Sequence, residues 1–222
     1  MVELIEFEVP SDGGFLPALA EGVDRPCIAV LGHGAGSHAH HNTMERLAGL
    51  IRDAGAGVVR FNFPYRAAGR SIPDRMPTLV ESFRAVVEDV RKRFGPASLV
   101  VGGHSMGGRV ASMMEAESSQ ADGLLLFGYP LHPPGQLEKL RDAHLPSIQT
   151  RTLQLNGTQD ELCNRALMEQ VAAKLEPSIY TLHWLEGADH SYQVKRASGR
   201  TAVDIDAEIL TQLIAWFKGI RA

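Results

Sequence analysis

The chain has 222 residues, 44% hydrophobic and 22% charged, which suits a folded globular protein with one sizeable core. Its net charge of -4 argues against general nucleic-acid binding, which depends on neutralising phosphates. The acidic start and the lack of a long apolar run argue against a secretory signal and a membrane span. With only two cysteines, Cys27 and Cys163, we expect a reduced, cytoplasmic protein with one domain over residues 1–222 and neither nucleic-acid nor membrane partners.

Short apolar runs alternate with amphipathic stretches along the chain, which predicts a mostly parallel sheet with helices on both faces. The expected strands are residues 4–9, a weaker one at 15–20, then 27–31, 57–61, 98–102, 123–127, 151–156 and 179–185. The inner runs at 28–31 and 124–127 are continuously apolar, as expected for strands that are covered on both faces.

Helical periodicity fills the intervals between these strands. The expected helices cover residues 42–54, 78–94, a stretch after Ser105, about 165–175 and about 204–218. Asn42 and Glu45 resemble a capping box at the first helix, and Pro77 stands at the start of the second. The last helix is expected to bury a stripe made of Ile205, Ile209, Leu213, Ile214 and Phe217.

Residues 129–150 do not fit a strand–helix unit. They contain four prolines, Pro130, Pro133, Pro134 and Pro146. These predict mostly loop, with at most a short helix around residues 136–143. Because the segment is too short for a full lid domain, we expect a modest rim over a site that stays fairly open.

A G-x-S-x-G pattern occupies residues 103–107, where a predicted strand meets a predicted helix. In this arrangement, a nucleophile elbow, the serine sits on a strained turn, and small residues on either side let the backbone close up. The turn raises the hydroxyl of Ser105 above the sheet and directs the first N–H groups of the helix at a developing oxyanion. The alternative is a glycine-rich turn that holds an incidental serine.

A serine hydroxyl needs a base to take its proton, and the base needs a third group to fix its tautomer. The elbow arrangement supplies them in the chain order Ser, Asp or Glu, His. Asp160 follows the predicted strand 151–156, and His190 follows the strand 179–185. Both strands should end at the same edge of the sheet, so we predict the triad Ser105, Asp160 and His190. Weaker rivals for these roles are Asp189, Glu161, His183, His132 and His144.

The loop after the strand 27–31 reads Gly32-His33-Gly34-Ala35-Gly36, a glycine-rich turn like that of esterases. The backbone N–H groups of Ala35 and Met106 are therefore the candidate oxyanion donors, with a merely flexible turn as the alternative.

Two other patterns share this loop but predict neither a cofactor nor a metal. Residues 34–39 satisfy G-x-G-x-x-A, yet the helix begins later and Asn62, not an acid, follows the next strand, so a nicotinamide site is disfavoured. His38, His40 and His41 lack an accompanying carboxylate or cysteine at the spacing of a known metal site, which favours a polar loop.

Arg66, Arg70 and Arg75 lie in a predicted loop near the edge of the site. They are candidates to receive an anionic part of a substrate, with solvated surface as the alternative. Tyr65, Arg66 and Tyr129 are the candidate substrate-binding residues.

With these segments together, the chain resembles a little-characterised α/β-hydrolase family that includes proteins similar to subunit three of the non-specific lethal complex and is loosely related to dienelactone hydrolases. The segments that carry the resemblance are 32–36, 61–65, the elbow followed by Gly108-Arg109, 127–135, 157–160 and 187–191. The resemblance implies the α/β-hydrolase fold without a full lid domain and the triad Ser105, Asp160 and His190. This chain departs from the pattern of its relatives at His104, where they often carry lysine. It departs from the dienelactone hydrolases at Ser105, where they use cysteine.

The expected reaction is acyl transfer to water: Ser105 attacks a small-molecule carboxylic ester or similar bond and forms an acyl-enzyme. Thioesters and amides are alternative substrates. A rival from another class is a non-catalytic interaction module that keeps the hydrolase fold. The sequence leaves the physiological substrate and the oligomeric state open.

Overall fold

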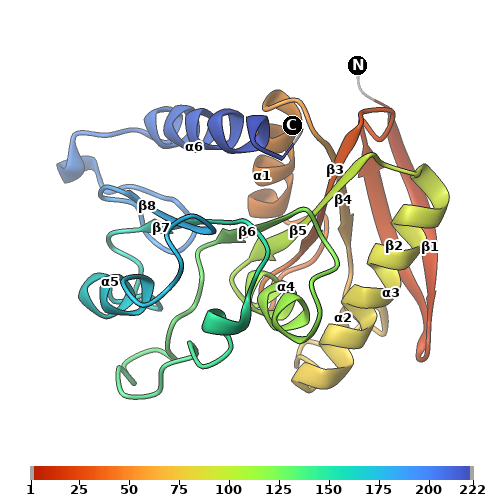
Figure 1. The fold of residues 1–222 in the computed structure, drawn as a ribbon, viewed down its shortest axis with the longest axis horizontal. Coiled ribbons are helices and arrows are strands. Elements are labelled where there is room, and N and C mark those ends of the chain that lie inside the picture. Colours follow the sequence, from red (N-terminus) through yellow and green to blue (C-terminus); the bar gives the residue numbers. More distant parts are fainter. Residues whose placement is uncertain (1–2, 221–222) are drawn as a thin grey trace.

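The computed structural model describes residues 3–220, which are built around one eight-stranded sheet (Figure 1). Its strands are β1 (Leu4–Ser11), β2 (Gly14–Glu21), β3 (Cys27–Gly32), β4 (Gly57–Phe61), β5 (Ser98–His104), β6 (Gly123–Phe127), β7 (Thr152–Gly157) and β8 (Tyr180–Leu185). The strand order is β1-β2-β4-β3-β5-β6-β7-β8. Strands β3 to β8 run parallel, whereas β1 and β2 form an antiparallel hairpin at one edge. The predicted mostly parallel sheet is confirmed.

The inner strands are covered on both faces. Every residue of β3, β4, β6 and β7 is buried, which explains why β3 and β6 are apolar runs rather than alternating patterns. In contrast, β7 alternates its leucines with the buried polar residues Thr152, Gln154 and Asn156. Along β3, Ile28 and Val30 join one hydrophobic core, while Ala29 and Leu31 join the other. Successive side chains point to opposite faces, so one short strand serves both cores.

The helices divide between the two faces of the sheet (Figure 1). They are α1 (Asn42–Asp53), α2 (Pro64–Ala67), α3 (Met76–Phe94), α4 (Met106–Glu117), α5 (Arg165–Ala172) and α6 (Ala202–Lys218), with 3-10 turns at η1 (Leu145–Ser147) and η2 (Arg196–Ser198). Helices α1 and α6 pack together on one face, and α3 and α4 cover the other (Figure 1). Within residues 3–220, no helix is both long and apolar enough to cross a membrane.

Two details of the predicted helices are wrong. The N-cap of α1 is His41, whose Nδ1 accepts a hydrogen bond from the Thr43 N–H at 3.2 Å, so Asn42 lies inside the first turn and forms no capping box. In α6, Ile214 is 40% exposed and Trp216 is buried in its place. A residue directly after the buried Leu213 is turned about 100° around the helix, whereas Trp216 returns to the buried face.

The rim segment, residues 129–150, is mostly loop, as predicted. No helix forms over residues 136–143; the segment has isolated turns and the 3-10 turn η1 instead. Leu131, Leu145 and Ile148 are buried in the core on the α4 side. The rim is therefore packed against the body of the protein, and the described residues contain no full lid domain.

Candidate active site

Ser105 lies where β5 turns into α4, in a backbone conformation that side-chain-bearing residues rarely adopt. Its φ is 53° and its ψ is -117°. The Ser105 N–H donates a 2.8 Å hydrogen bond to the Phe127 carbonyl at the end of β6, which holds the turn in place. Such strain persists only where the surroundings impose it, and it is common at functional sites. The turn has the geometry predicted for a nucleophile elbow.

The glycines of the elbow are required by close backbone packing. A Cβ atom on Gly103 would lie 2.2 Å from the Gly32 carbonyl oxygen, and one on Gly107 would lie 2.0 Å from the same oxygen. Real Cβ atoms do not approach so closely, so neither position accepts a side chain. The end of β3 therefore packs directly against both sides of the serine turn.

Asp160 and His190 meet above the carboxyl ends of neighbouring strands. Asp160 follows β7 and His190 follows β8, and His190 Nδ1 lies 2.9 Å from Asp160 Oδ2. The Asp160 side chain is fully buried, whereas the His190 side chain is 24% exposed. The carboxylate can only accept, so Nδ1 carries the proton and Nε2 has a free lone pair.

Asn156 fixes the carboxylate that His190 meets, a role that the sequence reasoning missed. Its Nδ2 donates to Asp160 Oδ2 at 3.2 Å and to the Tyr129 carbonyl at 3.3 Å. The Leu162 N–H donates to Asp160 Oδ1 at 2.8 Å. The signal was present, because an amide in a fully buried strand such as β7 must find hydrogen-bond partners.

Ser105 and His190 open onto the same shallow pocket of about 230 Å³. Its lining residues are Gly34, Ala35, Gly36, Ser37, His41, Thr43, His104, Ser105, His190 and Ser191. Within residues 3–220, the Ser105 hydroxyl makes no hydrogen bond to the His190 ring. Catalytic hydrogen bonds are often long in ligand-free proteins and tighten when substrate binds.

The rival residues have other partners. Asp189 Oδ1 accepts from the N–H groups of Ser191 and Gln193, at 2.9 and 2.8 Å, and so shapes the loop that carries His190. His183 Nε2 lies 2.7 Å from a carboxylate oxygen of Glu208 on α6. His132 Nε2 accepts from the Asn164 N–H at 3.1 Å, His144 Nε2 lies 2.8 Å from Ser112 Oγ, and Glu161 is exposed.

The glycine-rich loop after β3 forms one wall of the pocket and is held by a buried histidine. His33 Nε2 accepts from the Phe63 N–H at 3.2 Å, so its Nδ1 carries the proton and donates to the Gly34 carbonyl at 2.8 Å. Burial lowers the pKa of His33 to about 4, which keeps the ring neutral at pH 7. Ala35 lines the pocket, and Met106 begins α4, where the first N–H groups have no acceptor within the helix.

The three candidate substrate-binding residues do not line this pocket. Tyr65 and Tyr129 are fully buried, and the Tyr129 hydroxyl donates to the Arg141 carbonyl at 2.5 Å. Arg66 lies in α2, and its Nη1 makes a 3.4 Å hydrogen bond to the Arg70 carbonyl. The Arg70 guanidinium pairs with Asp74 at 2.7 Å, and Arg75 is the N-cap of α3. None of these five candidate residues lines the pocket around Ser105.

The histidines after the glycine-rich loop serve the loop and α1. His41 caps α1 and lines the pocket, and His40 Nδ1 lies 3.8 Å from Glu45. The rings of His38 and His41 are 5.9 Å apart. Among the residues that the structure describes, no three His, Cys, Asp or Glu side chains are placed to hold a metal ion.

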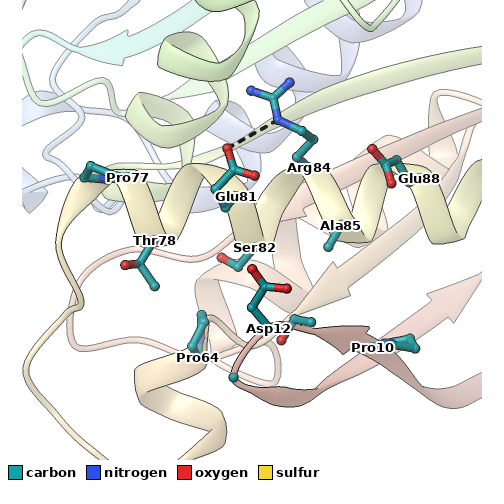
Figure 2. Close-up of a pocket in the computed structure, with 12 residues that line it drawn as sticks. Pro10, Asp12, Pro64, Pro77, Thr78, Glu81, Ser82, Arg84, Ala85 and Glu88 are labelled. Atoms are coloured by element: carbon teal, nitrogen blue, oxygen red, sulfur yellow. Dashed lines mark ion pairs between the residues drawn. The ribbon is translucent and has the colours of Figure 1, made fainter.

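A cavity of about 450 Å³, larger than the one at Ser105, lies away from this site. It is formed by the β1–β2 turn, the start of α2 and one side of α3, with Asp12 and Ser82 facing it (Figure 2). Ser82 Oγ donates to the Leu79 carbonyl at 2.8 Å, and Arg84 extends to Glu117 on α4. Among the described residues, no histidine lines this cavity, and no hydrogen bond joins Ser82 to one of its carboxylates.

Two of the buried histidines, His33 and His104, predict a loss of stability in acid. Burial lowers the pKa of both His33 and His104 from 6.5 to about 4, and for His104 the nearby His190 adds to the effect. As pH falls below 6.5 the unfolded chain binds these protons first, so the free energy of unfolding should fall between pH 6.5 and pH 4, by up to about 3 kcal/mol per histidine. Urea unfolding from pH 7 to pH 4 measures this dependence. In His104→Gln, the slope of the free energy of unfolding against pH should shrink by the contribution of about one proton. An unchanged slope would contradict the lowered pKa of His104.

An eight-stranded, mostly parallel sheet with a strand–serine–helix elbow is the architecture of an α/β hydrolase. In agreement, the family model for the alpha/beta hydrolase domain matches residues 26–218. The chain belongs to this family, which confirms the superfamily placement predicted from its motifs.

Solved structures show the same fold. A serine hydrolase homologue from Coxiella burnetii is 17% identical, with 94% of this chain and 97% of that chain covered and a TM-score of 0.76. A serine hydrolase without a lid from Xanthomonas campestris is 22% identical, with 96% and 95% covered and a TM-score of 0.75. A dienelactone hydrolase from Anabaena variabilis is 17% identical, with 98% of each chain covered and a TM-score of 0.76. At these identities the likeness concerns the fold.

Proposed function

We propose that this protein is a serine hydrolase that cleaves carboxylic esters of small molecules through an acyl-enzyme on Ser105. Membership of the α/β hydrolase family supports hydrolase activity in general. The observation that carries the finer proposal is the 2.9 Å hydrogen bond between His190 Nδ1 and Asp160, beside a strained serine that opens onto the same pocket. Nothing in the proposed chemistry requires a metal or a cofactor.

The proposed reaction begins with proton transfer from Ser105 to His190 Nε2. Nε2 is free to accept because Nδ1 donates to Asp160. The serine oxygen attacks the ester carbonyl, and the imidazolium that forms is stabilised by the buried carboxylate. His190 then protonates the leaving alcohol and activates a water molecule, which releases the acid and restores Ser105.

The developing oxyanion is assigned to the backbone N–H groups of Ala35 and Met106. Met106 follows the nucleophile directly at the start of α4, where the helix dipole also favours negative charge. Ala35 lines the pocket, in the loop that His33 holds through Gly34. Each such donor contributes about 3–4 kcal/mol to transition-state stabilisation in enzymes of this kind.

Two features support a small ester as the substrate. The pocket is small and open, and the rim over residues 129–150 packs down without a full lid, which leaves access to small soluble esters. Similar folds include Est1E from Butyrivibrio proteoclasticus, solved with ferulic acid at 13% identity, and the carboxylesterase EstE1 from a metagenomic library at 17% identity. Thioesters and amides are the next substrate classes to try.

A fluorophosphonate probe tests the proposal directly, because it reacts with a serine only when a base activates it. We expect covalent labelling of Ser105 in the folded protein, located by peptide mass spectrometry, and no labelling in Ser105→Ala. Ser191→Ala is a matched control, since Ser191 lines the same pocket and its loss should leave the labelling intact. A folded protein whose Ser105 stays unlabelled would favour the non-catalytic interaction module.

A further inference from the structure

His104, the residue directly before the nucleophile, contacts the loop that carries the base. Its Nε2 lies 2.9 Å from the His190 carbonyl oxygen. A carbonyl can only accept, so Nε2 carries the proton and donates it. Burial lowers the pKa of His104 to about 4, with the nearby His190 adding to the effect, so the ring is neutral at pH 7. The two imidazole rings also pack together, with their centroids 5.0 Å apart.

The same ring touches the other walls of the site. A Cβ atom on Gly34, in the proposed oxyanion loop, would lie 3.3 Å from His104 Nδ1. A Cβ atom on Gly128, where the rim begins, would lie 3.3 Å from His104 Nε2 and 3.1 Å from the His190 carbonyl oxygen. One imidazole thus meets the oxyanion loop, the rim and the His190 loop, and it is covalently next to Ser105.

Other contacts hold the His190 loop to the rest of the protein but not to the nucleophile. The Tyr192 hydroxyl donates to the Leu155 carbonyl on β7 at 2.8 Å, and Asp189 closes the loop on itself. The hydrogen bond from His104 joins this loop to the strand that ends at the serine. Its loss would leave the distance between base and nucleophile less well determined.

We propose that His104 is a positioning residue for catalysis: its Nε2–H holds the His190 backbone, and its ring supports the His190 ring, so that His190 Nε2 meets Ser105. This inference rests on the proposed function, since it assigns a role within the same site. His104 exchanges no proton with the substrate; it acts through His190.

The test compares His104→Leu, which lacks a donor, with His104→Gln, whose amide N–H reaches about as far as Nε2. With p-nitrophenyl butyrate, we expect His104→Leu to lower kcat by about 10–100-fold and to change KM less than about threefold. His104→Gln should recover most of kcat. His183→Leu, a remote histidine that pairs with Glu208, is the matched control. Full kcat in folded His104→Leu, or no recovery in folded His104→Gln, would overturn the proposal.

A second variant perturbs the contact between the His190 carbonyl and His104 Nε2 without changing either side chain. Gly128→Ala places a methyl group against both the His190 carbonyl and His104 Nε2. Gly135→Ala is its control, because Gly135 has a similarly positive φ of 69° but nothing within 4 Å of its added Cβ. We expect kcat to fall in Gly128→Ala and to stay near the wild-type value in Gly135→Ala. An equal fall of kcat in the two variants would show that backbone strain alone is responsible. It would refute a catalytic role for the contact between His104 and the His190 carbonyl.

A proton NMR readout needs no turnover and separates this proposal from the proposed function. The His190 Nδ1–H, hydrogen-bonded to Asp160, should give a downfield signal that shifts in His104→Leu and returns in His104→Gln. If the wild type fails to react with fluorophosphonate, the proposed function is wrong, and this signal still tests the positioning role. If the wild type reacts but His104→Leu matches it in both signal and labelling rate, only the positioning role is refuted.

Discussion

Replacement of Ser105 by alanine is expected to lower kcat for a short p-nitrophenyl ester by about 10⁴-fold or more. The serine oxygen is the atom that would carry the acyl group, and no other side chain takes its place on the strained turn. What remains should come from binding and from the oxyanion donors alone. Initial rates of p-nitrophenol release at saturating substrate measure the effect.

The fold should survive this change, because the turn is held by backbone contacts that do not involve the Ser105 side chain. The Ser105 N–H still donates to the Phe127 carbonyl, and Gly103 and Gly107 still pack against Gly32. Circular dichroism and the thermal midpoint should therefore resemble those of the wild type. Activity that survives in the alanine variant would show that Ser105 is not the nucleophile.

Asp160→Asn should lower kcat by about 10³–10⁴-fold while keeping the shape of the site. The Leu162 N–H donates to Oδ1, so the amide oxygen of the new side chain should take that position. Its NH₂ should then turn toward His190 and give up the hydrogen bond from Asn156 Nδ2. His190 Nδ1 would then have to accept, which places the proton on Nε2 and leaves no lone pair for the serine proton. Steady-state kinetics at pH 7 measure the loss, and the downfield His190 signal should disappear.

Asp189→Asn is the matched comparison for this prediction. Asp189 adjoins His190 in sequence, but its carboxylate accepts from two N–H groups of its own loop. Its amide oxygen can take over both hydrogen bonds, so kcat should change by less than about tenfold. A larger loss of kcat in Asp189→Asn than in Asp160→Asn would show that Asp189, not Asp160, is the carboxylate that orients His190.

Local sequence patterns predicted the sheet well, for physical reasons, and they singled out Asp160 and His190, which the structure places 2.9 Å apart. Parallel strands buried on both faces favour apolar runs, and β3 and β6 are such runs. The elbow requires glycines at fixed offsets because its backbone packs tightly, and this leaves a pattern that can be read from the sequence.

Contacts between distant segments could not be predicted in this way. His104 and His190 are 86 residues apart, and their hydrogen bond leaves no periodic pattern in either segment. Asn156 and Asp160 lie four residues apart, yet their contact depends on how the chain turns after β7. The short helix allowed for at residues 136–143 does not form; this stretch is mostly exposed, so tertiary packing does not supplement its local helix propensity.

The packing of Gly103 and Gly107 against the Gly32 carbonyl has a consequence for altering this protein by design. It locks the serine turn to the loop with the proposed oxyanion donors, so these two parts have no freedom to adapt separately to a new ligand. Changes of selectivity are better sought in pocket-lining side chains outside that backbone contact, such as Ser37, Thr43 and Ser191. Libraries confined there would leave the chemical apparatus intact while reshaping its entrance.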